Sequence, residues 1–246
     1  MPSRTQHTYV LVHGAWHDGR VWSRVAALLT AAGHRVLAPS LSGHGDKAHL
    51  LGPRIGLTTH IDDVVDLVLD QDLDDVVLVG HSYAGMVVSG VANRIPKRVA
   101  RLVYVDAMVP VHGESAVDVM PLTQALIDGA AATAEPWRIP PLPELPAPYG
   151  LFGVTDPDDV AWLRTMLTDE SVLCFQQPVQ LDDPAQALIP RTHVLCVGDE
   201  PPGVTRRPVP PTQPNGEPSR VHELRSGHDC MITRPGELAD LLLLHP

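Results

Sequence analysis

Cysteine, long apolar runs and positive charge are all scarce in this sequence. The 246 residues include three cysteines, Cys174, Cys196 and Cys230, without the spacing of a metal site. An odd number of dispersed cysteines argues against a disulfide framework and indicates reduced thiols. No apolar run approaches the roughly 20 residues that a membrane helix requires. We therefore predict a cytoplasmic protein without membrane contact.

The charge balance excludes a further class of partners. Lysine and arginine number 18 against 29 acidic residues, which gives a net charge of −11. A surface of this sign repels phosphate backbones, so we expect no nucleic-acid partner. Apolar residues make up 44% and charged residues 19%, proportions that are ordinary for a globular protein. The length predicts one domain over residues 1–246.

Apolar strand patterns alternate with helical patterns along most of the chain. The strand-like runs are TYVLV, HRVLAP, DVVLVG, RLVYV and THVLCVG, and amphipathic segments such as WSRVAALLTAAG and TTHIDDVVDLVLDQ separate the first of them. Continuous apolar strands are typical of a parallel sheet whose two faces are both covered by helices. The sequence therefore predicts an α/β fold, with about six strands in a mostly parallel sheet.

The alternation breaks in the middle of the chain. Twelve prolines lie between Pro110 and Pro190, together with both phenylalanines and two of the four tryptophans. We interpret residues 110–190 as a small inserted cap. A second proline-rich segment, residues 201–219, contains seven prolines, which exclude a helix or an inner strand. We expect this segment either to gate the active site or to pack rigidly on the surface.

The sharpest functional signal is VVLVGHSYAGMVVSGVA. It joins an apolar strand to a helix through a turn that carries Ser82, with Gly80 two residues before the serine and Ala84 two residues after it. Small residues at these places allow the strand and the helix to pass closely while the turn exposes the serine. The pattern predicts a nucleophile elbow with Ser82 as the nucleophile.

A serine hydroxyl needs a base, and the base needs an orienting carboxylate. His228, in the loop between the last strand pattern and the last helix pattern, is the predicted base. For the acid, Asp199 and Glu200 follow THVLCVG, and Asp106 follows RLVYV. We choose Asp199 and keep the other two as alternatives.

An acyl-transfer site also requires backbone donors for the oxyanion. The expected donors are the amides of Tyr83, which follows the nucleophile, and of Ala15, in the loop after the first strand. The loop HGAWHDG lacks the spacing of a phosphate-binding loop, and its glycines argue against a helical metal site. We expect no metal and no cofactor.

The segments VLVHGAWHDGRVW, SLSGHG, VGHSYAG, YVDAMVP and GHDCMITRPGELA occur in this order. In them the chain resembles the plant methylesterase and hydroxynitrile lyase branch of the α/β-hydrolases and its bacterial esterase relatives. The resemblance implies a triad of Ser82, a carboxylate near Asp199, and His228. Lyases of this branch carry Thr and Lys where this chain has Gly14 and Asp229, so the resemblance favours ester hydrolysis.

We therefore expect a serine hydrolase that cleaves a carboxylic ester or lactone of a small apolar or aromatic molecule. Two alternatives stay open: lyase or cyclisation chemistry with the same triad, and a ligand-binding protein without turnover. The expected partner is the small-molecule substrate, and the sequence does not exclude a homodimer.

Overall fold

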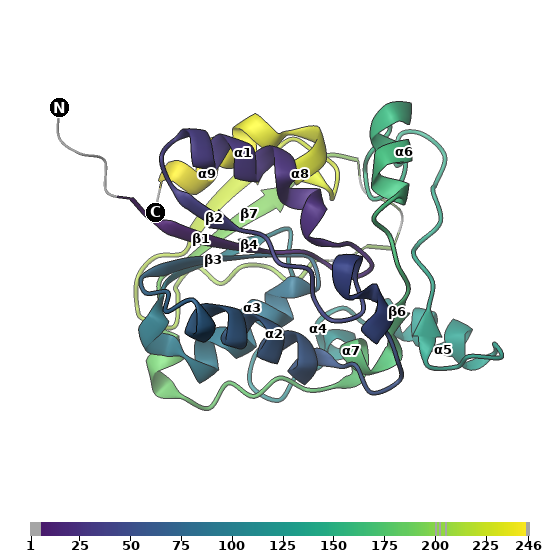
Figure 1. The fold of residues 1–246 in the computed structure, drawn as a ribbon, viewed down its shortest axis with the longest axis horizontal. Helices are drawn as coiled ribbons and strands as arrows, with labels where there is room; N and C mark the ends of the chain where they lie inside the picture. The colour runs from purple at the N-terminus through teal and green to yellow at the C-terminus, as the bar shows by residue number, and fades with distance from the viewer. Residues whose placement is uncertain (1–5, 200, 202, 205, 245–246) are drawn as a thin grey trace.

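The computed structural model describes residues 6–199, 201, 203–204 and 206–244, and its centre is a six-stranded sheet. The strand order is β2-β1-β3-β4-β7-β8, and all neighbouring strands are parallel (Figure 1). The strands span Thr8–Val12 (β1), Arg35–Leu37 (β2), Val76–His81 (β3), Val99–Val105 (β4), Arg191–Cys196 (β7) and Arg220–Leu224 (β8). The predicted α/β class and sheet are thus confirmed.

Helices cover both faces of the sheet because alternate strand residues point in opposite directions. In β1, Tyr9 and Leu11 join the apolar cluster on one face, whereas Val10 and Val12 join the cluster on the other. Figure 1 shows α1, α8 and α9 on one side of the sheet and α2 and α3 on the other. These helices span Ser23–Ala31 (α1), Leu57–Asp70 (α2), Ala84–Arg94 (α3), Cys230–Thr233 (α8) and Pro235–Leu244 (α9).

Residues 110–190, which we call the inserted segment, lie between β4 and β7 in sequence. Figure 1 places most of them past the carboxyl ends of the strands, but their last part returns along α3, where the amide of Asp183 donates to Oδ1 of Asn93 at 2.8 Å. Their elements are Ala116–Val119 (α4), Thr123–Ala131 (α5), Arg138–Ile139 (β5), Pro157–Arg164 (α6), Glu170–Ser171 (β6), Val172–Gln176 (α7) and the 3₁₀ helix Pro184–Leu188. The short strands β5 and β6 form a separate antiparallel pair. Three further 3₁₀ helices, Gly19–Trp22, Gly45–Leu50 and Pro96–Arg98, lie outside the inserted segment.

The proline-rich segment 201–219 contains neither a helix nor a sheet strand among its described residues, as its prolines predict. It includes a turn in which the amide of Gln213 donates to the carbonyl of Glu217 at 2.8 Å. Thr212 and Pro218 form an isolated antiparallel bridge beside it. Residues 202 and 205 lie outside the described residues.

The first turn of α3 passes unusually close to the chain that follows β4. A Cβ atom at Gly85 would lie 1.9 Å from the carbonyl oxygen of Met108. No side-chain rotation can relieve this contact because both atoms belong to the backbone or are fixed by it. Glycine at position 85 is therefore a packing requirement of the serine turn.

We expect Gly85→Ala to lower the free energy of unfolding by more than about 2 kcal/mol, since overpacking against backbone forces a helix shift. Gly129→Ala is the matched control. Gly129 lies exposed in α5, and nothing stands within 4 Å of its added Cβ, so alanine there should change stability by less than about 1 kcal/mol, in the favourable direction. Urea denaturation measures both variants. Equal effects would contradict the close approach.

Candidate active site

Ser82 occupies the turn between β3 and α3 with a left-handed backbone, at φ 55°. A non-glycine residue in this region is strained and must be held by its surroundings. The Ser82 amide donates to the carbonyl of Val105 at 3.2 Å, and its carbonyl accepts from the amides of Gly85 and Met108 at 3.1 and 3.0 Å. These bonds connect the turn to the end of β4. Ser82 itself stays partly exposed, as the sequence predicts for a nucleophile elbow.

Two glycines let other chain segments approach this turn. A Cβ at Gly80 would lie 2.7 Å from the carbonyl oxygen of Ala84, and one at Gly14 would lie 2.9 Å from the Cβ of Ser82. The first contact confirms the predicted need for a small residue two positions before the serine. The second shows that the loop after β1 lies directly against Ser82.

The loop that carries His228 lies beside the same turn. His81, the residue before Ser82, is fully buried, and its Nε2 is 3.1 Å from the carbonyl oxygen of His228. The two imidazole rings lie 4.5 Å apart between centroids. Burial, followed by the nearby charge of His228, lowers the pKa of His81 well below 6.5. A neutral His81 donates its Nε2 proton to that carbonyl and holds the His228 loop in place.

Asp106 orients the imidazole of His228. Its Oδ2 is 2.6 Å from Nδ1 of His228, and its Oδ1 accepts from the amide of Cys196 at 3.1 Å. The Asp106 side chain is 1% exposed and that of His228 is 32% exposed. A buried carboxylate on Nδ1 fixes the ring and leaves Nε2 available for proton transfer.

The choice of Asp199 as the partner of His228 is therefore wrong in this structure. Asp106 directly follows β4, the neighbour of β3, and its amide still bonds β7 through the carbonyl of Val194 at 2.7 Å. Asp199 follows β7, one strand farther from β3, and it is exposed. The two residues before it still pair with β8 and the chain just after it, through the carbonyls of Leu224 and Ser226. Glu200 lies outside the described residues. One signal favoured Asp106. It comes immediately after the buried strand β4, which lies next to β3, the strand that leads to Ser82.

Arg206 joins the proline-rich segment to this carboxylate. Its Nη2 is 2.9 Å from Oδ2 of Asp106, and its Nη1 donates to the carbonyl of Cys196 at 2.6 Å. The next residue, Arg207, makes two hydrogen bonds of 2.8 Å to the carboxylate of Glu114. Both arginines hold this segment against the chain after β4.

The two backbone donors predicted for the oxyanion lie in the loop after β1 and at the start of α3. Neither the amide of Ala15 nor that of Tyr83 donates to another described residue. Unpaired amides beside a nucleophile are the feature that an oxyanion hole requires.

The inserted segment holds the Ala15 loop through the adjoining residue, Trp16. The Trp16 amide donates to Oε2 of Glu170 at 3.4 Å, and its indole Nε1 donates to the carbonyl of Ile139 at 3.2 Å. Its carbonyl accepts from the amide of Thr168 at 2.8 Å. The strand pair β5–β6 and the chain before it thus fix a residue whose backbone is left-handed, at φ 66°.

A buried pair that the sequence analysis missed supports the same loop. Nε2 of His17 is 2.9 Å from Oδ2 of Asp229, and its Nδ1 is 2.7 Å from the carbonyl oxygen of Ala15. Burial lowers the pKa of His17, but the charge and hydrogen bond of Asp229 outweigh it, so the pKa is raised above 6.5. Only the fold brings these residues, 212 positions apart, into contact.

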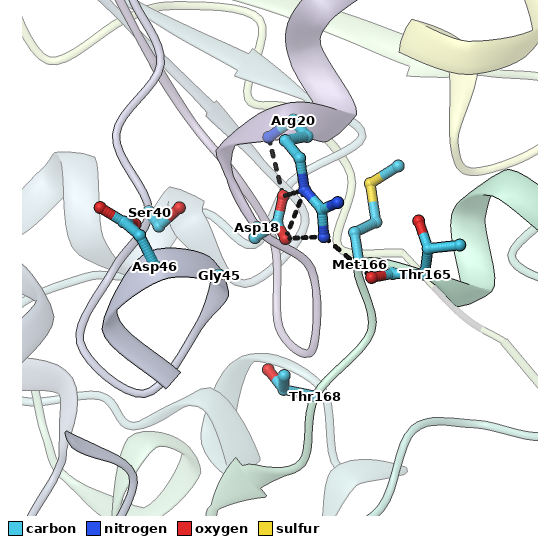
Figure 2. Close-up of a pocket in the computed structure, with 8 residues that line it drawn as sticks. All are labelled: Asp18, Arg20, Ser40, Gly45, Asp46, Thr165, Met166 and Thr168. Atoms are coloured by element: carbon cyan, nitrogen blue, oxygen red, sulfur yellow. Dashed lines mark hydrogen bonds and ion pairs between the residues drawn. The ribbon is translucent and has the colours of Figure 1, made fainter. Parts of the chain in front are cut away.

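A pocket of about 470 Å³ lies beside Asp18 and Arg20, which follow this loop in sequence (Figure 2). Asp18 lines it and is bound by the guanidinium of Arg20, which also donates to the carbonyl of Thr165 at 2.8 Å. Neither Ser82 nor His228 lines this pocket. It is therefore separate from the candidate reaction centre.

A family model described as the alpha/beta hydrolase family matches residues 9–241. The chain belongs to the alpha/beta hydrolase family. This confirms the resemblance seen in the sequence and the prediction of a hydrolase. No helix among the described residues combines the length and apolar composition that crossing a membrane requires.

The similar proteins include esterases and other hydrolases, and also an alpha-hydroxynitrile lyase of Arabidopsis thaliana. The chain is 37% identical to a carbendazim hydrolyzing esterase of Nocardioides sp. (strain SG-4G), over 95% of this chain and 97% of that protein. It is 28% identical to Methylesterase 10 of Arabidopsis thaliana, over 98% and 92%. An extracellular alpha/beta-hydrolase from a Paenibacillus species has the same fold, with a TM-score of 0.76 at 24% identity over 97% and 98% of the chains.

Substitution of the acid distinguishes the two candidate aspartates. Asp106→Asn should lower kcat by roughly 10⁴-fold, because the amide favours the wrong tautomer of His228. Asp199→Asn, the matched control, should change kcat by less than about threefold since this exposed side chain does not reach the imidazole. Steady-state hydrolysis of a chromogenic ester measures both. A crippled Asp199 variant beside an active Asp106 variant would reverse the assignment.

The His17–Asp229 pair predicts a pH dependence of stability. A histidine whose pKa is raised on folding contributes stability that is fully present below its unfolded value of 6.5 and is lost as pH rises through the folded value. Asp229→Asn should therefore cost roughly 2 kcal/mol near pH 6 and less at high pH. Unfolding free energies of the wild type and the variant, measured across this range, test the sign. A cost that grows with pH would contradict it.

Proposed function

We propose that the chain is a serine esterase that cleaves a carboxylic ester or lactone through an acyl-enzyme on Ser82. The observation that carries the proposal is the pair of His228 and Asp106, 2.6 Å apart, packed against the strained turn of Ser82. The enzyme class of the relatives supports the same chemistry.

The reaction divides into two proton-coupled steps. In the first, Nε2 of His228 takes the hydroxyl proton as Oγ of Ser82 attacks the ester carbonyl, and the amides of Ala15 and Tyr83 stabilise the oxyanion. Collapse of this intermediate breaks the ester C–O bond, and His228 gives its proton to the leaving alcohol. In the second, His228 deprotonates a water that attacks the acyl carbonyl, and as the bond to Ser82 breaks, His228 returns the proton to Oγ of Ser82 and the acid leaves. Asp106, 2.6 Å from Nδ1 of His228, holds the imidazolium that forms in each step.

The surroundings of His228 favour an apolar or aromatic substrate. Phe152 is partly exposed, and its carbonyl accepts from the amide of Asp229 at 2.9 Å, which places this aromatic residue beside the His228 loop. The Phe152 ring lies 5.8 Å from that of Trp16, next to the oxyanion loop. Phe175 is fully buried and belongs to the core, so it offers no surface to a substrate. We propose that the inserted segment is a cap whose contribution to the substrate site is Phe152.

Two positions favour hydrolysis over lyase chemistry. Gly14 stands where the resembling lyases carry Thr, and a Cβ there would lie 2.9 Å from Ser82. Asp229 stands where they carry Lys, and its carboxylate is bound to His17. A Thr side chain at position 14 would therefore collide with Ser82. At position 229 this chain carries an acidic side chain where the lyases carry a basic one.

The test is covalent labelling followed by kinetics. A fluorophosphonate should label Ser82 in the wild type, and Ser82→Ala or His228→Ala should lower kcat by roughly 10⁴- to 10⁶-fold. Ser226→Ala, two residues from His228, is the control and should keep its activity within a few-fold. Melting curves establish that each variant is folded. Folded Ser82→Ala protein with wild-type turnover would exclude the acyl-enzyme.

The substrate is identified with a panel of methyl esters, short acyl esters and lactones, with carbendazim included because a relative is named for it. Phe152→Ala should raise KM for aromatic esters more than for acetyl esters, because only the former lose a ring contact. Cyanohydrin cleavage without ester hydrolysis would favour the lyase alternative. Fluorophosphonate labelling without turnover of any ester would favour a binding protein.

A further inference from the structure

A second group of reactive side chains lies in the interior and takes no part in the proposed reaction. His44 precedes the 3₁₀ helix Gly45–Leu50, His60 belongs to α2, and Glu170 belongs to β6 of the inserted segment. All three are fully buried, and one ligand atom from each lies within 4.8 Å of the others. Three distant parts of the chain thus bring two imidazoles and one carboxylate to a single point.

The contact between His44 and Glu170 has an unusual geometry. Nε2 of His44 is 3.2 Å from Oε2 of Glu170, yet this nitrogen has no hydrogen-bond partner among the described residues. The two atoms are close but are not aligned for a shared proton. Two ligands of one ion show this relation, because the lone pairs point at the ion rather than at each other.

Both histidines are oriented as metal ligands are. Nε2 of His60 is 3.0 Å from the carbonyl oxygen of Ser42, so it carries the proton, and the lone pair of Nδ1 faces the hydroxyl of Tyr83 at 3.2 Å, a partner that a bound ion would replace. Nδ1 of His44 is 2.7 Å from the hydroxyl of Thr168, which leaves Nε2 toward Glu170. A second partner on the remaining ring nitrogen fixes the tautomer and the ring of a metal-binding histidine.

We propose that His44, His60 and Glu170 bind one divalent transition-metal ion of the Zn²⁺ type. Two imidazole nitrogens and one carboxylate oxygen match a three-ligand zinc set that leaves a fourth position open. The thiol of Cys174, whose Sγ is 3.9 Å from Nδ1 of His60, lies beside this position.

The ion would connect the inserted segment to the core beneath the oxyanion loop. Oε2 of Glu170 also accepts from the amide of Trp16 at 3.4 Å, so a fixed Glu170 fixes this loop. Thr168, the partner of His44, lines the pocket of Figure 2, as does Gly45. Solvent therefore reaches the residues that surround the site from the side of this pocket.

A rival group must be distinguished from this one. His81, His228 and Asp229 also hold ligand atoms within 4.8 Å of one another. An ion in this rival group would bind His228, the proposed base, whereas an ion bound by Glu170 would leave His228 free. Binding of one metal ion by the protein therefore does not show which of the two groups holds it. Variants of each group are needed to locate the ion.

The experiment uses full-length protein stripped with a chelator and titrated with ZnCl₂, followed by calorimetry and by elemental analysis after desalting. The wild type should bind one equivalent of Zn²⁺ at this site. Glu170→Gln and His60→Asn should each weaken binding by about 100-fold or more, and Thr168→Val by about 10- to 100-fold. Asp229→Asn, from the rival group, and His193→Gln, a buried histidine elsewhere, are the matched controls and should bind as the wild type does.

The melting temperature gives a second readout that does not depend on ester hydrolysis. Zn²⁺ at about 100 times its Kd should raise the melting temperature of the wild type by roughly 5–10 °C, and it should not raise that of Glu170→Gln. Metal-free melting curves show whether each variant is folded. Stripped wild type that binds no Zn²⁺ would overturn the proposal whatever the variants do, and loss of binding in Asp229→Asn but not in Glu170→Gln would assign the ion to the rival group.

Discussion

The close passage of three backbone segments around Ser82 is the constraint on which the rest of the site depends. The loop after β1, the turn between β3 and α3, and the chain after β4 meet where an added Cβ at Gly14 or Gly85 would overlap existing atoms. Hydrogen bonds from the end of β4 hold Ser82 in its left-handed conformation. The parallel sheet makes this possible, because it delivers the carboxyl ends of its strands to one edge.

The same packing determines where charge can lie. Asp106 is nearly inaccessible to water, and its two oxygens are shared among His228, the amide of Cys196 and Arg206. A buried carboxylate is tolerated only when its lone pairs are used in this way. The guanidinium of Arg206 comes from the proline-rich segment, so a segment without regular structure supplies a partner of the residue that orients the imidazole.

The inserted segment holds the loop after β1, in addition to the contribution of Phe152 to the substrate site that we propose. Glu170, Ile139 and Thr168 each bond Trp16, whose neighbour Ala15 supplies one of the proposed oxyanion donors. His17 and Asp229 support the loop from the opposite side. The position of the Ala15 amide therefore depends on contacts from both the inserted segment and the last loop of the core.

The sequence by itself determined the parallel sheet, the serine turn and the place of His228 on the loop before the last helices. These features depend on local patterns, since apolar strands, small residues around a serine and a downstream histidine can each be recognised within a few residues. Only the tertiary structure decided that Asp106 rather than Asp199 reaches His228. The choice depends on the order of strands in the sheet, which places β4 next to β3 and β7 one strand farther away. The buried contacts of His17, His44 and Arg206 were beyond sequence reasoning for the same reason, because each joins residues that only the folded chain brings together.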